Sequence, residues 1–271
     1  MISSLTNSKV KLVRRLQTGR RARHREGKLV LEGARLVREA LVADKPLDFV
    51  FYTAGWAKTP AGATLLDAVS RTGCLLSPVS DAVMASCADT NTPQGVLAVL
   101  PFPRFPLPAE PTFILVVDRL RIPGNLGTIL RTAAAAGVEL VILPPGNVDH
   151  FAPKVVRGGM GAHFRLPVLR LGWAETEARL AGLDVWLAAA GKGTQYNEVD
   201  WTRPLALIVG GEARGASERA QGMATGRVLI PMPGGVESLN TAVAAGVLLF
   251  EVVRQREDAG RRISSVSGQP G

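Results

Sequence analysis

Three short segments in the second half of the 271-residue chain combine polar side chains with glycines, a composition that suits ligand binding. The first, PGNLGTILR, contains Asn125, Gly127 and Arg131. Asn125 can cap the helix expected after it, and Gly127 lets another backbone or a ligand approach closely. Arg131 is charged within an apolar run, so it either reaches solvent along its aliphatic stem or meets an anion.

The other two segments also follow apolar runs. In LIVGGEARG (207–215), Gly210 and Gly211 would permit a ligand to lie against the backbone, and Glu212 adds a carboxylate. The alternative interpretation is a strand-to-helix turn in which the helix dipole stabilises Glu212. In IPMPGGVESLN (230–240), Ser238 is the predicted N-cap of a helix that begins with small residues and can therefore pack closely.

The elements around these segments alternate between strand and helix. The pattern predicts strands at 113–117, 139–143, 164–169, 184–189, 205–209 and 227–232, and helices after Asn125, near 153–158, at 173–180 and at 238–256. Continuous apolar strands between helices indicate a parallel sheet covered on both faces. All three polar segments follow a strand, and open α/β sheets bind ligands beyond the carboxyl ends of their strands.

The first hundred residues predict a smaller α/β unit. Its expected helices are 8–17, 34–42 and 81–87, and its expected strands are 29–32, 48–53 and 95–100. Five prolines within 101–111 disfavour helix and central strand and indicate a semi-rigid linker. We therefore expect domains at 1–100 and 112–258 and a flexible tail at 259–271.

The charge of the chain is positive and uneven. The net charge is +9, and residues 1–50 carry 12 basic and 5 acidic side chains. The basic residues Arg14, Arg15, Arg20, Arg21 and Arg23 lie in and just after the helix predicted at 8–17. A concentrated basic segment suggests a polyanion partner, with nucleic acid favoured over membrane because no amphipathic anchor accompanies it. The alternative is a solvated basic face.

Several functional classes do not fit the sequence. No segment has the roughly 18 continuous apolar residues of a membrane span, and the basic amino terminus lacks the apolar block of a secretory signal, so we expect a cytoplasmic protein. Two cysteines and three histidines offer neither a disulfide framework nor a metal cluster. GKGT (191–194) lacks the upstream glycine of a P-loop.

Together and in this order, the three segments closely resemble the signature of the SpoU family of RNA ribose 2′-O-methyltransferases, in the SPOUT superfamily. The matching residues are Asn125, Gly127 and Arg131, then G-x-E-x-x-G at 210–215, then I-P-M at 230–232 and S-L-N at 238–240. KLVLEGARLVREAL (28–41) resembles the L30e-like substrate-binding domain that many members carry in front. The chain departs from the family at Thr241-Ala242, where Val-Ser is common, and at Arg157-Gly158-Gly159, where R-x-S is common.

The resemblance implies a parallel sheet with a carboxyl-terminal trefoil knot that holds S-adenosylmethionine (AdoMet), and a homodimer with sites at its interface. By transfer, the cofactor would be held by Gly210, Gly211, Ile230, Met232 and Leu239, and no metal is implied. The residues assigned to catalysis are Arg131, Asn125, Glu212, Ser238 and Asn240. Because a guanidinium stays protonated, we expect Arg131 to hold a phosphate or stabilise the forming alkoxide, not to act as the base.

The expected substrate is structured RNA. The front domain favours rRNA over tRNA, because L30e-like units read RNA shape and unpaired loops, and 23S rRNA is the expected target. The five arginines near the amino terminus are the predicted RNA contacts. Alternatives are a SPOUT enzyme that methylates tRNA or a base nitrogen, and a non-catalytic RNA-binding protein associated with the ribosome.

Overall fold

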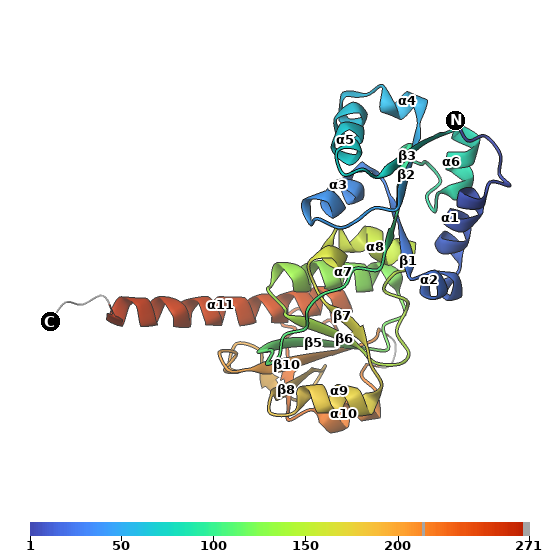
Figure 1. Cartoon of the computed structure of the whole chain (residues 1–271). Coiled ribbons are helices and arrows are strands. Elements are labelled where there is room, and N and C mark those ends of the chain that lie inside the picture. The colour runs from blue at the N-terminus through green and yellow to red at the C-terminus, as the bar shows by residue number, and fades with distance from the viewer. Residues whose placement is uncertain (213–214, 268–271) are drawn as a thin grey trace. The chain divides into compact units, whose positions relative to one another are not determined.

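The structure is a computed structural model that describes residues 1–212 and 215–267 (Figure 1). The chain forms two compact units. Unit 1 comprises Met1–Arg104 together with Asp149–Arg165, and unit 2 comprises Phe105–Val148 together with Leu166–Gly271. The chain therefore passes from one unit to the other at three points, the first of them inside the proline-rich stretch.

Unit 1 is built on a mixed four-stranded sheet with the strand order β1-β4-β2-β3. The strands are β1 (Lys28–Glu32), β2 (Phe49–Thr53), β3 (Leu75–Val79) and β4 (Val96–Pro101). Strand β4 pairs antiparallel with β1 and β2, and β2 pairs parallel with β3. Its helices are α1 (Ser8–Thr18), α2 (Arg20–Glu26), α3 (Ala34–Val42), α4 (Ala54–Ala57), α5 (Pro60–Ser70), α6 (Asp81–Cys87), α8 (Pro153–Gly159) and the 3-10 helix η1 (Ala162–Phe164).

Alternate residues of this sheet enter two separate hydrophobic cores. Leu29 and Leu31 of β1 pack with α3, α5 and α8 on one face, whereas Val30 packs with α1 and α6 on the other. The period of two along the strand explains why neighbouring residues reach opposite faces. Helices α1 and α3 therefore cover different faces of the sheet.

Residues 149–165 are part of unit 1 although they lie inside the 112–258 region of the sequence. Val156 and Phe164 enter the core formed with α3 and α5. The ring of Phe151 stacks on that of Phe102, with 3.8 Å between the centroids. Asp149 accepts from the buried Arg23, with Nη2 2.8 Å from Oδ2. Apolar packing and a buried ion pair thus both attach this segment to the amino-terminal fold.

Unit 2 is a seven-stranded, entirely parallel sheet with the order β7-β6-β5-β10-β8-β11-β9. The strands are β5 (Phe113–Asp118), β6 (Leu140–Leu143), β7 (Val168–Arg170), β8 (Asp184–Ala188), β9 (Thr194–Gln195), β10 (Leu205–Gly210) and β11 (Gly226–Leu229). The expected α/β class with a parallel sheet is confirmed.

Helices cover both faces of this sheet, as Figure 1 shows. Helices α9 (Trp173–Leu180) and α10 (Glu218–Met223) pack on one face, where Leu180 and Ala220 join the core with alternate strand residues such as Ile208. Helices α7 (Pro123–Ala135) and α11 (Thr241–Ser267) lie side by side on the other face. The first and third polar segments of the sequence are therefore carried by neighbouring helices.

Most predicted elements are present, with local differences. Helices α2, α4, α5 and α10 and strands β3 and β9 were not predicted, and the strand expected at 164–169 is replaced by η1 and the shorter β7. Strand β11 ends at Leu229, so Ile230, Pro231 and Met232 lie in a loop. Helix α11 continues to Ser267, into the stretch predicted to be a flexible tail, and residues 268–271 lie outside the described part.

Candidate active site

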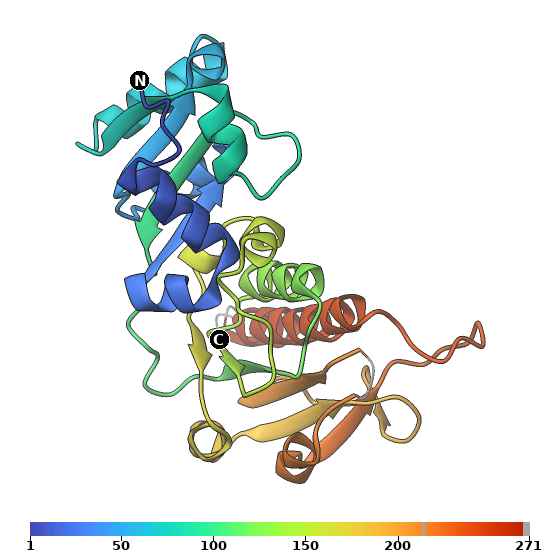
Figure 2. The same cartoon turned by 90° about the vertical axis from the view of Figure 1, so that its right-hand side faces the viewer.

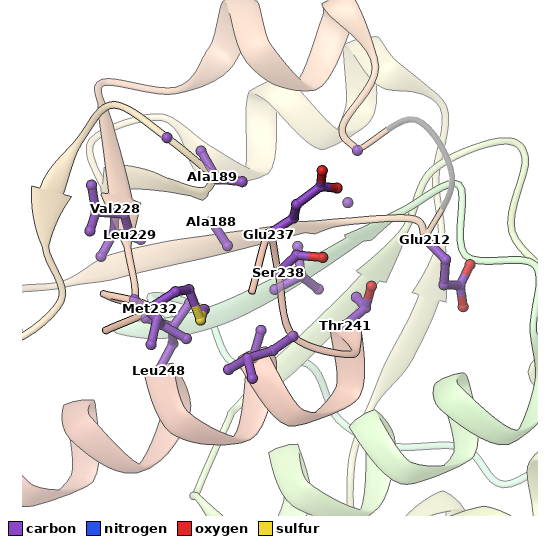
Figure 3. Close-up of a pocket in the computed structure, with 18 of the residues that line it drawn as sticks. Ala188, Ala189, Glu212, Val228, Leu229, Met232, Glu237, Ser238, Thr241 and Leu248 are labelled. Atoms are coloured by element: carbon purple, nitrogen blue, oxygen red, sulfur yellow. The ribbon is translucent and has the colours of Figure 1, made fainter. Parts of the chain in front are cut away.

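A cavity of about 470 Å³ lies at the carboxyl edge of the unit 2 sheet. Its walls come from the ends of β8, β10 and β11, from the loops that follow them, and from the first turns of α11 (Figure 3). All five residues predicted to hold the cofactor line it: Gly210, Gly211, Ile230, Met232 and Leu239. Two of the predicted catalytic residues, Glu212 and Ser238, line it too.

Three polar side chains from the three sequence segments form one hydrogen-bonded chain beside this cavity. The amide Nδ2 of Asn125 donates to Glu212 Oε1 at 2.7 Å. The Oδ1 of Asn125 accepts from Nδ2 of Asn240 at 3.3 Å. Both ends of the Asn125 amide are therefore engaged, which fixes its orientation. Segments 87 and 115 residues apart in the sequence meet at this one side chain.

The loop after β5 is fastened to its neighbours by two buried side chains. Asp118 Oδ2 accepts from the backbone N–H of Ser217 at 2.6 Å, which holds the end of the loop that carries Glu212. Asn147 donates to the carbonyls of Val117 and Pro144 and accepts from the N–H of Leu120. These bonds satisfy polar backbone groups that the strand ends leave unpaired.

Close backbone approach explains the two glycines after β10. A Cβ placed on Gly210 would lie 2.4 Å from the nitrogen of Ala216, and one on Gly211 would lie 2.4 Å from the carbonyl oxygen of Arg119. Any side chain at either position would force these loops apart. Ala213 and Arg214, within the G-x-E-x-x-G segment, lie outside the described residues.

The two helix caps predicted in this region are wrong. Helix α7 begins at Pro123, a favoured first helical residue, so Asn125 lies in the first turn and its side chain is free to bind Glu212. Helix α11 begins at Thr241, and Asn240, not Ser238, caps it: Asn240 Oδ1 accepts from the N–H of Ala242 at 2.8 Å. Asn240 thus both caps α11 and binds Asn125.

Arg131 lies on α7, two turns after Asn125, and its side chain is exposed. It makes no hydrogen bond or ion pair with any residue that the structure describes. Its side chain therefore reaches solvent, the first of the two interpretations given above, and its guanidinium has no described partner that would keep it from an external anion.

The cavity has the size and surface of a small-molecule site. Ligand pockets usually measure about 300–1,000 Å³ and combine apolar walls with a few polar groups. Here Met232 and Leu248 give an apolar side, and Glu237 and Ser238 a polar one. Gly215 also lines the cavity, and a Cβ added there would meet no described atom within 4 Å, so a ligand can lie against its backbone.

The sequence reasoning missed two parts of the cavity wall. Residues 188–191 line it because they end β8 and begin the loop after it, and the end of the strand predicted at 184–189 was the signal that could have found them. GKGT was rejected as a P-loop, yet its Gly191 contributes backbone to this wall. Glu237 was also missed, although it immediately precedes Ser238.

The five predicted RNA-contact arginines divide into two groups. Arg14, Arg15, Arg20 and Arg21 are exposed on α1 and α2 and form no ion pair with described residues. Arg23 is 4% exposed, and it donates to Asp149 Oδ2 and to the carbonyl of Leu16. Its assignment to RNA contact is corrected, because a guanidinium satisfied in the core cannot reach a phosphate.

The environment of Asp149 shows how firmly Arg23 is held. Burial alone would raise the pKa of the Asp149 carboxyl, but the hydrogen bond and charge of Arg23, helped by His24, outweigh it and lower the pKa. The carboxylate therefore stays ionised and paired with the guanidinium.

No helix among the described residues is long and apolar enough to cross a membrane. No group of three or more His, Cys, Asp or Glu side chains among those residues is placed to hold a metal ion.

Comparison with known proteins agrees with the geometry. The family model described as SpoU rRNA methylase matches residues 112–250, and that of the MRM3-like substrate binding domain matches residues 7–98. An uncharacterized tRNA/rRNA methyltransferase of Synechocystis is 39% identical over 262 residues, 94% of each chain. The 23S rRNA (guanosine(2553)-2′-O)-methyltransferase of Bacillus subtilis is 32% identical over 253 residues, 93% of this chain and 98% of that one.

A solved structure extends the likeness to three dimensions. The crystal structure of an AdoMet-bound rRNA methyltransferase from Sinorhizobium meliloti matches with a TM-score of 0.80 at 30% identity, over 93% of this chain and 97% of that one. The resemblance seen in the three polar segments is confirmed. The chain belongs to the SpoU rRNA methylase family.

Proposed function

We propose that this protein methylates the 2′-hydroxyl of a ribose in rRNA, with AdoMet as the methyl donor. The observation that carries the proposal is the meeting of Asn125, Glu212 and Asn240 beside a cavity lined by every predicted cofactor residue. Family membership supports both the reaction and the cofactor, since relatives include a 23S rRNA 2′-O-methyltransferase and AdoMet-bound enzymes. We favour 23S rRNA as the substrate.

The cavity residues fit AdoMet by size and by donor chemistry. Backbone groups at Gly210, Gly211, Ile230 and Leu239 would hold its polar parts, with Met232 against an apolar part. When bound, AdoMet supplies an electrophilic methyl group on a positively charged sulfur.

The polar chain would position the ribose. A 2′-hydroxyl is a poor nucleophile, so its oxygen must be held in line with the methyl group and its developing charge must be stabilised. Arg131, exposed and unpaired among described residues, would hold the adjacent phosphate or stabilise the alkoxide while staying protonated. Asn125, Glu212, Ser238 and Asn240 would orient the ribose or Arg131, and the hydroxyl proton would pass to solvent.

Helices α1 and α2, which carry the basic residues, would bind the RNA. Arg14, Arg15, Arg20 and Arg21 present four exposed guanidinium groups from α1 and α2 without acidic partners among the described residues. Such groups bind phosphates with little regard to sequence. We retain these four residues as RNA contacts and omit Arg23.

Four finer features belong to the same proposal. A trefoil knot around the cofactor, an L30e-like front domain, a homodimer and a cytoplasmic location follow from the family resemblance and from an rRNA substrate. We also propose that 1–100 and 112–258 are the functional domains, joined by the linker 101–111.

The test is transfer of labelled methyl from AdoMet to purified 23S rRNA, 16S rRNA and tRNA, followed by alkaline hydrolysis. Methylation of a ribose blocks cleavage of the adjacent linkage, so we expect label in alkali-resistant dinucleotides from rRNA. Label in alkali-sensitive products would indicate base methylation, and label in tRNA alone would show that the substrate is tRNA and not rRNA. No transfer to any RNA would favour a non-catalytic RNA-binding protein.

A further inference from the structure

The charged side chains that line the cavity are both acidic. Glu212 and Glu237 contribute to its wall, whereas none of the described residues that line it is Lys, Arg or His. Two carboxylates on the wall, with no cationic side chain among the described residues that line it, favour a positively charged ligand.

The two carboxylates have different partners. Glu212 accepts the hydrogen bond from Asn125 and is therefore part of the polar chain described above. Glu237 makes no hydrogen bond or ion pair with any described residue. Figure 3 shows its carboxylate extending away from Met232 and Leu248 and in a different direction from that of Glu212. Glu237 is thus the carboxylate in this wall that no described side chain already engages.

The backbone on both sides of Glu237 is restrained. On one side, the N–H of Gly235 donates to the carbonyl of Met232 at 3.1 Å in a turn where Gly235 has a φ of 75°. On the other side, Asn240 caps α11 through the N–H of Ala242. Seven residues separate Met232 from the cap residue Asn240, so the Glu237 side chain is held near the cavity.

We propose that Glu237 makes the cavity prefer AdoMet over the product of methyl transfer, S-adenosylhomocysteine. This inference rests on the proposed function. In the transfer, a bond forms between the ribose oxygen and the methyl carbon, and the bond between that carbon and sulfur breaks. The electron pair stays on sulfur, which becomes a neutral thioether, and the hydroxyl proton leaves to solvent. The product therefore carries one positive charge fewer than AdoMet.

A carboxylate near the sulfur stabilises the two ligands unequally. Glu237 would attract the positively charged sulfur of AdoMet and lose that attraction once the methyl group has left. The residue would then act as a specificity determinant that favours exchange of spent for fresh cofactor. Its effect appears in the ratio of two dissociation constants, not in catalysis alone.

The experiment measures binding of AdoMet and of S-adenosylhomocysteine by calorimetry, without RNA. We compare the wild-type protein, Glu237→Gln and the control Glu218→Gln, which neutralises an exposed carboxylate of α10 outside the cavity wall. We expect Glu237→Gln to raise the Kd for AdoMet about three- to tenfold and the Kd for the product less than about twofold. Glu218→Gln should change neither, and Glu237→Asp should retain part of the preference.

Two results would overturn the inference. If Glu237→Gln weakens the binding of both ligands equally, Glu237 contacts a chemical group that AdoMet and S-adenosylhomocysteine share. If the variant binds both ligands as tightly as the wild type does, Glu237 does not contribute to cofactor binding.

The wild-type protein adds a test that does not require the variant to fold: its preference for AdoMet should shrink as NaCl rises from about 0.05 to about 0.5 M, because salt screens charges. A preference independent of salt also contradicts the inference. If the wild-type protein binds neither ligand, the proposed function itself fails.

Discussion

In the basic helices of unit 1, side chains that are neighbours in the sequence lie in different environments, whereas in the polar segments of unit 2, side chains that are distant in the sequence lie together. Five arginines lie close together between positions 14 and 23, yet four are exposed and Arg23 is in the core. Figure 2, which views the molecule from the side, shows the two helices that carry them. Asn125, Glu212 and Asn240 are far apart in the sequence, yet their side chains meet.

The difference shows what each kind of pattern can establish. Charge density indicates a region that binds a polyanion, but the direction of each side chain depends on helix phase and on buried partners. Polar residues after successive parallel strands indicate a common place, because the strand ends share one edge of the sheet. The predictions below separate structural residues from functional ones in the two regions.

The largest effect expected is on the stability of unit 1. Arg23→Ala leaves the buried Asp149 carboxylate without its guanidinium, which should lower the free energy of unfolding by about 3–5 kcal/mol. Urea denaturation measures the change. The exposed neighbour Arg21→Ala is the control and should stay within about 0.5 kcal/mol. If both substitutions lower the free energy of unfolding by the same small amount, the ion pair of Arg23 with Asp149 does not stabilise unit 1, and the correction made to Arg23 fails.

The next effect concerns catalysis in unit 2. Arg131→Ala removes the exposed cation that α7 carries after Asn125 and should lower kcat about 10²- to 10³-fold, with an unchanged Kd for AdoMet. Arg219→Ala, on the exposed surface of α10, should retain full activity. An Arg131→Ala protein that binds RNA and AdoMet normally and methylates at the wild-type rate would refute the role of Arg131.

Acid should weaken unit 1 through a histidine that cannot easily be protonated in the folded state. Burial lowers the pKa of His163 to about 4 from an ordinary 6.5. Below 6.5 the unfolded chain binds a proton that the folded chain does not, so stability should fall as pH drops toward 4, by about 1.4 kcal/mol per unit. His163→Gln keeps a donor for the His150 carbonyl and should flatten this dependence. If the stability of the variant falls equally steeply with pH, titratable groups other than His163 cause the dependence.

A smaller effect separates the two roles of Asn240. Asn240→Ala should cost about 1 kcal/mol because it removes the cap of α11, whereas Ser238→Ala should cost less than about 0.5 kcal/mol. Asn240→Asp keeps the cap acceptor and loses the donor to Asn125, so it should retain stability and lose activity. Thermal unfolding and methyl transfer, measured together, check all three variants. A larger stability loss from Ser238→Ala would restore Ser238 as the cap.

The smallest effect on the chemical step is expected from the basic helices. Replacing Arg14, Arg15, Arg20 and Arg21 with Gln should weaken RNA binding and reduce the slope of log K against log salt by roughly one per lost phosphate contact. The Kd for AdoMet should not change. Arg35 and Arg38, exposed on α3 over the other face of the unit 1 sheet, provide a double substitution that is matched in charge to the replacement of Arg14 and Arg15 alone. An equal loss from this control would indicate general charge attraction only.

The sequence predicted elements with clear periodicity and missed those without it. Helices α3, α6 and α9 have the predicted bounds because apolar residues at helical spacing lie between evident breaks. Helix α2 was missed because its buried residue is Arg23, a side chain that pattern rules place outside. Helix α5 was missed although Thr59 caps it and Pro60 begins it, a start signal that is visible in the sequence.

Tertiary packing accounts for what the sequence could not predict. Nothing in the order of residues 149–165 indicates that Val156 and Phe164 complete a core whose other members precede residue 101. The cofactor residues came from the family resemblance, and their placement around one cavity agrees with it. Glu237 carried no periodicity or motif of its own, so only its place in the cavity wall drew attention to it.

Single-turnover methyl transfer at saturating rRNA and AdoMet tests the separation of the two regions most directly. We predict that the protein with Gln at positions 14, 15, 20 and 21 transfers methyl to the same alkali-resistant site at the wild-type rate once RNA is saturating. Arg131→Ala should remain slow at any RNA concentration. If the four-arginine variant transfers methyl slowly even at saturating RNA, or if Arg131→Ala reaches the wild-type rate there, then unit 1 does not serve RNA binding alone or Arg131 of unit 2 does not serve catalysis.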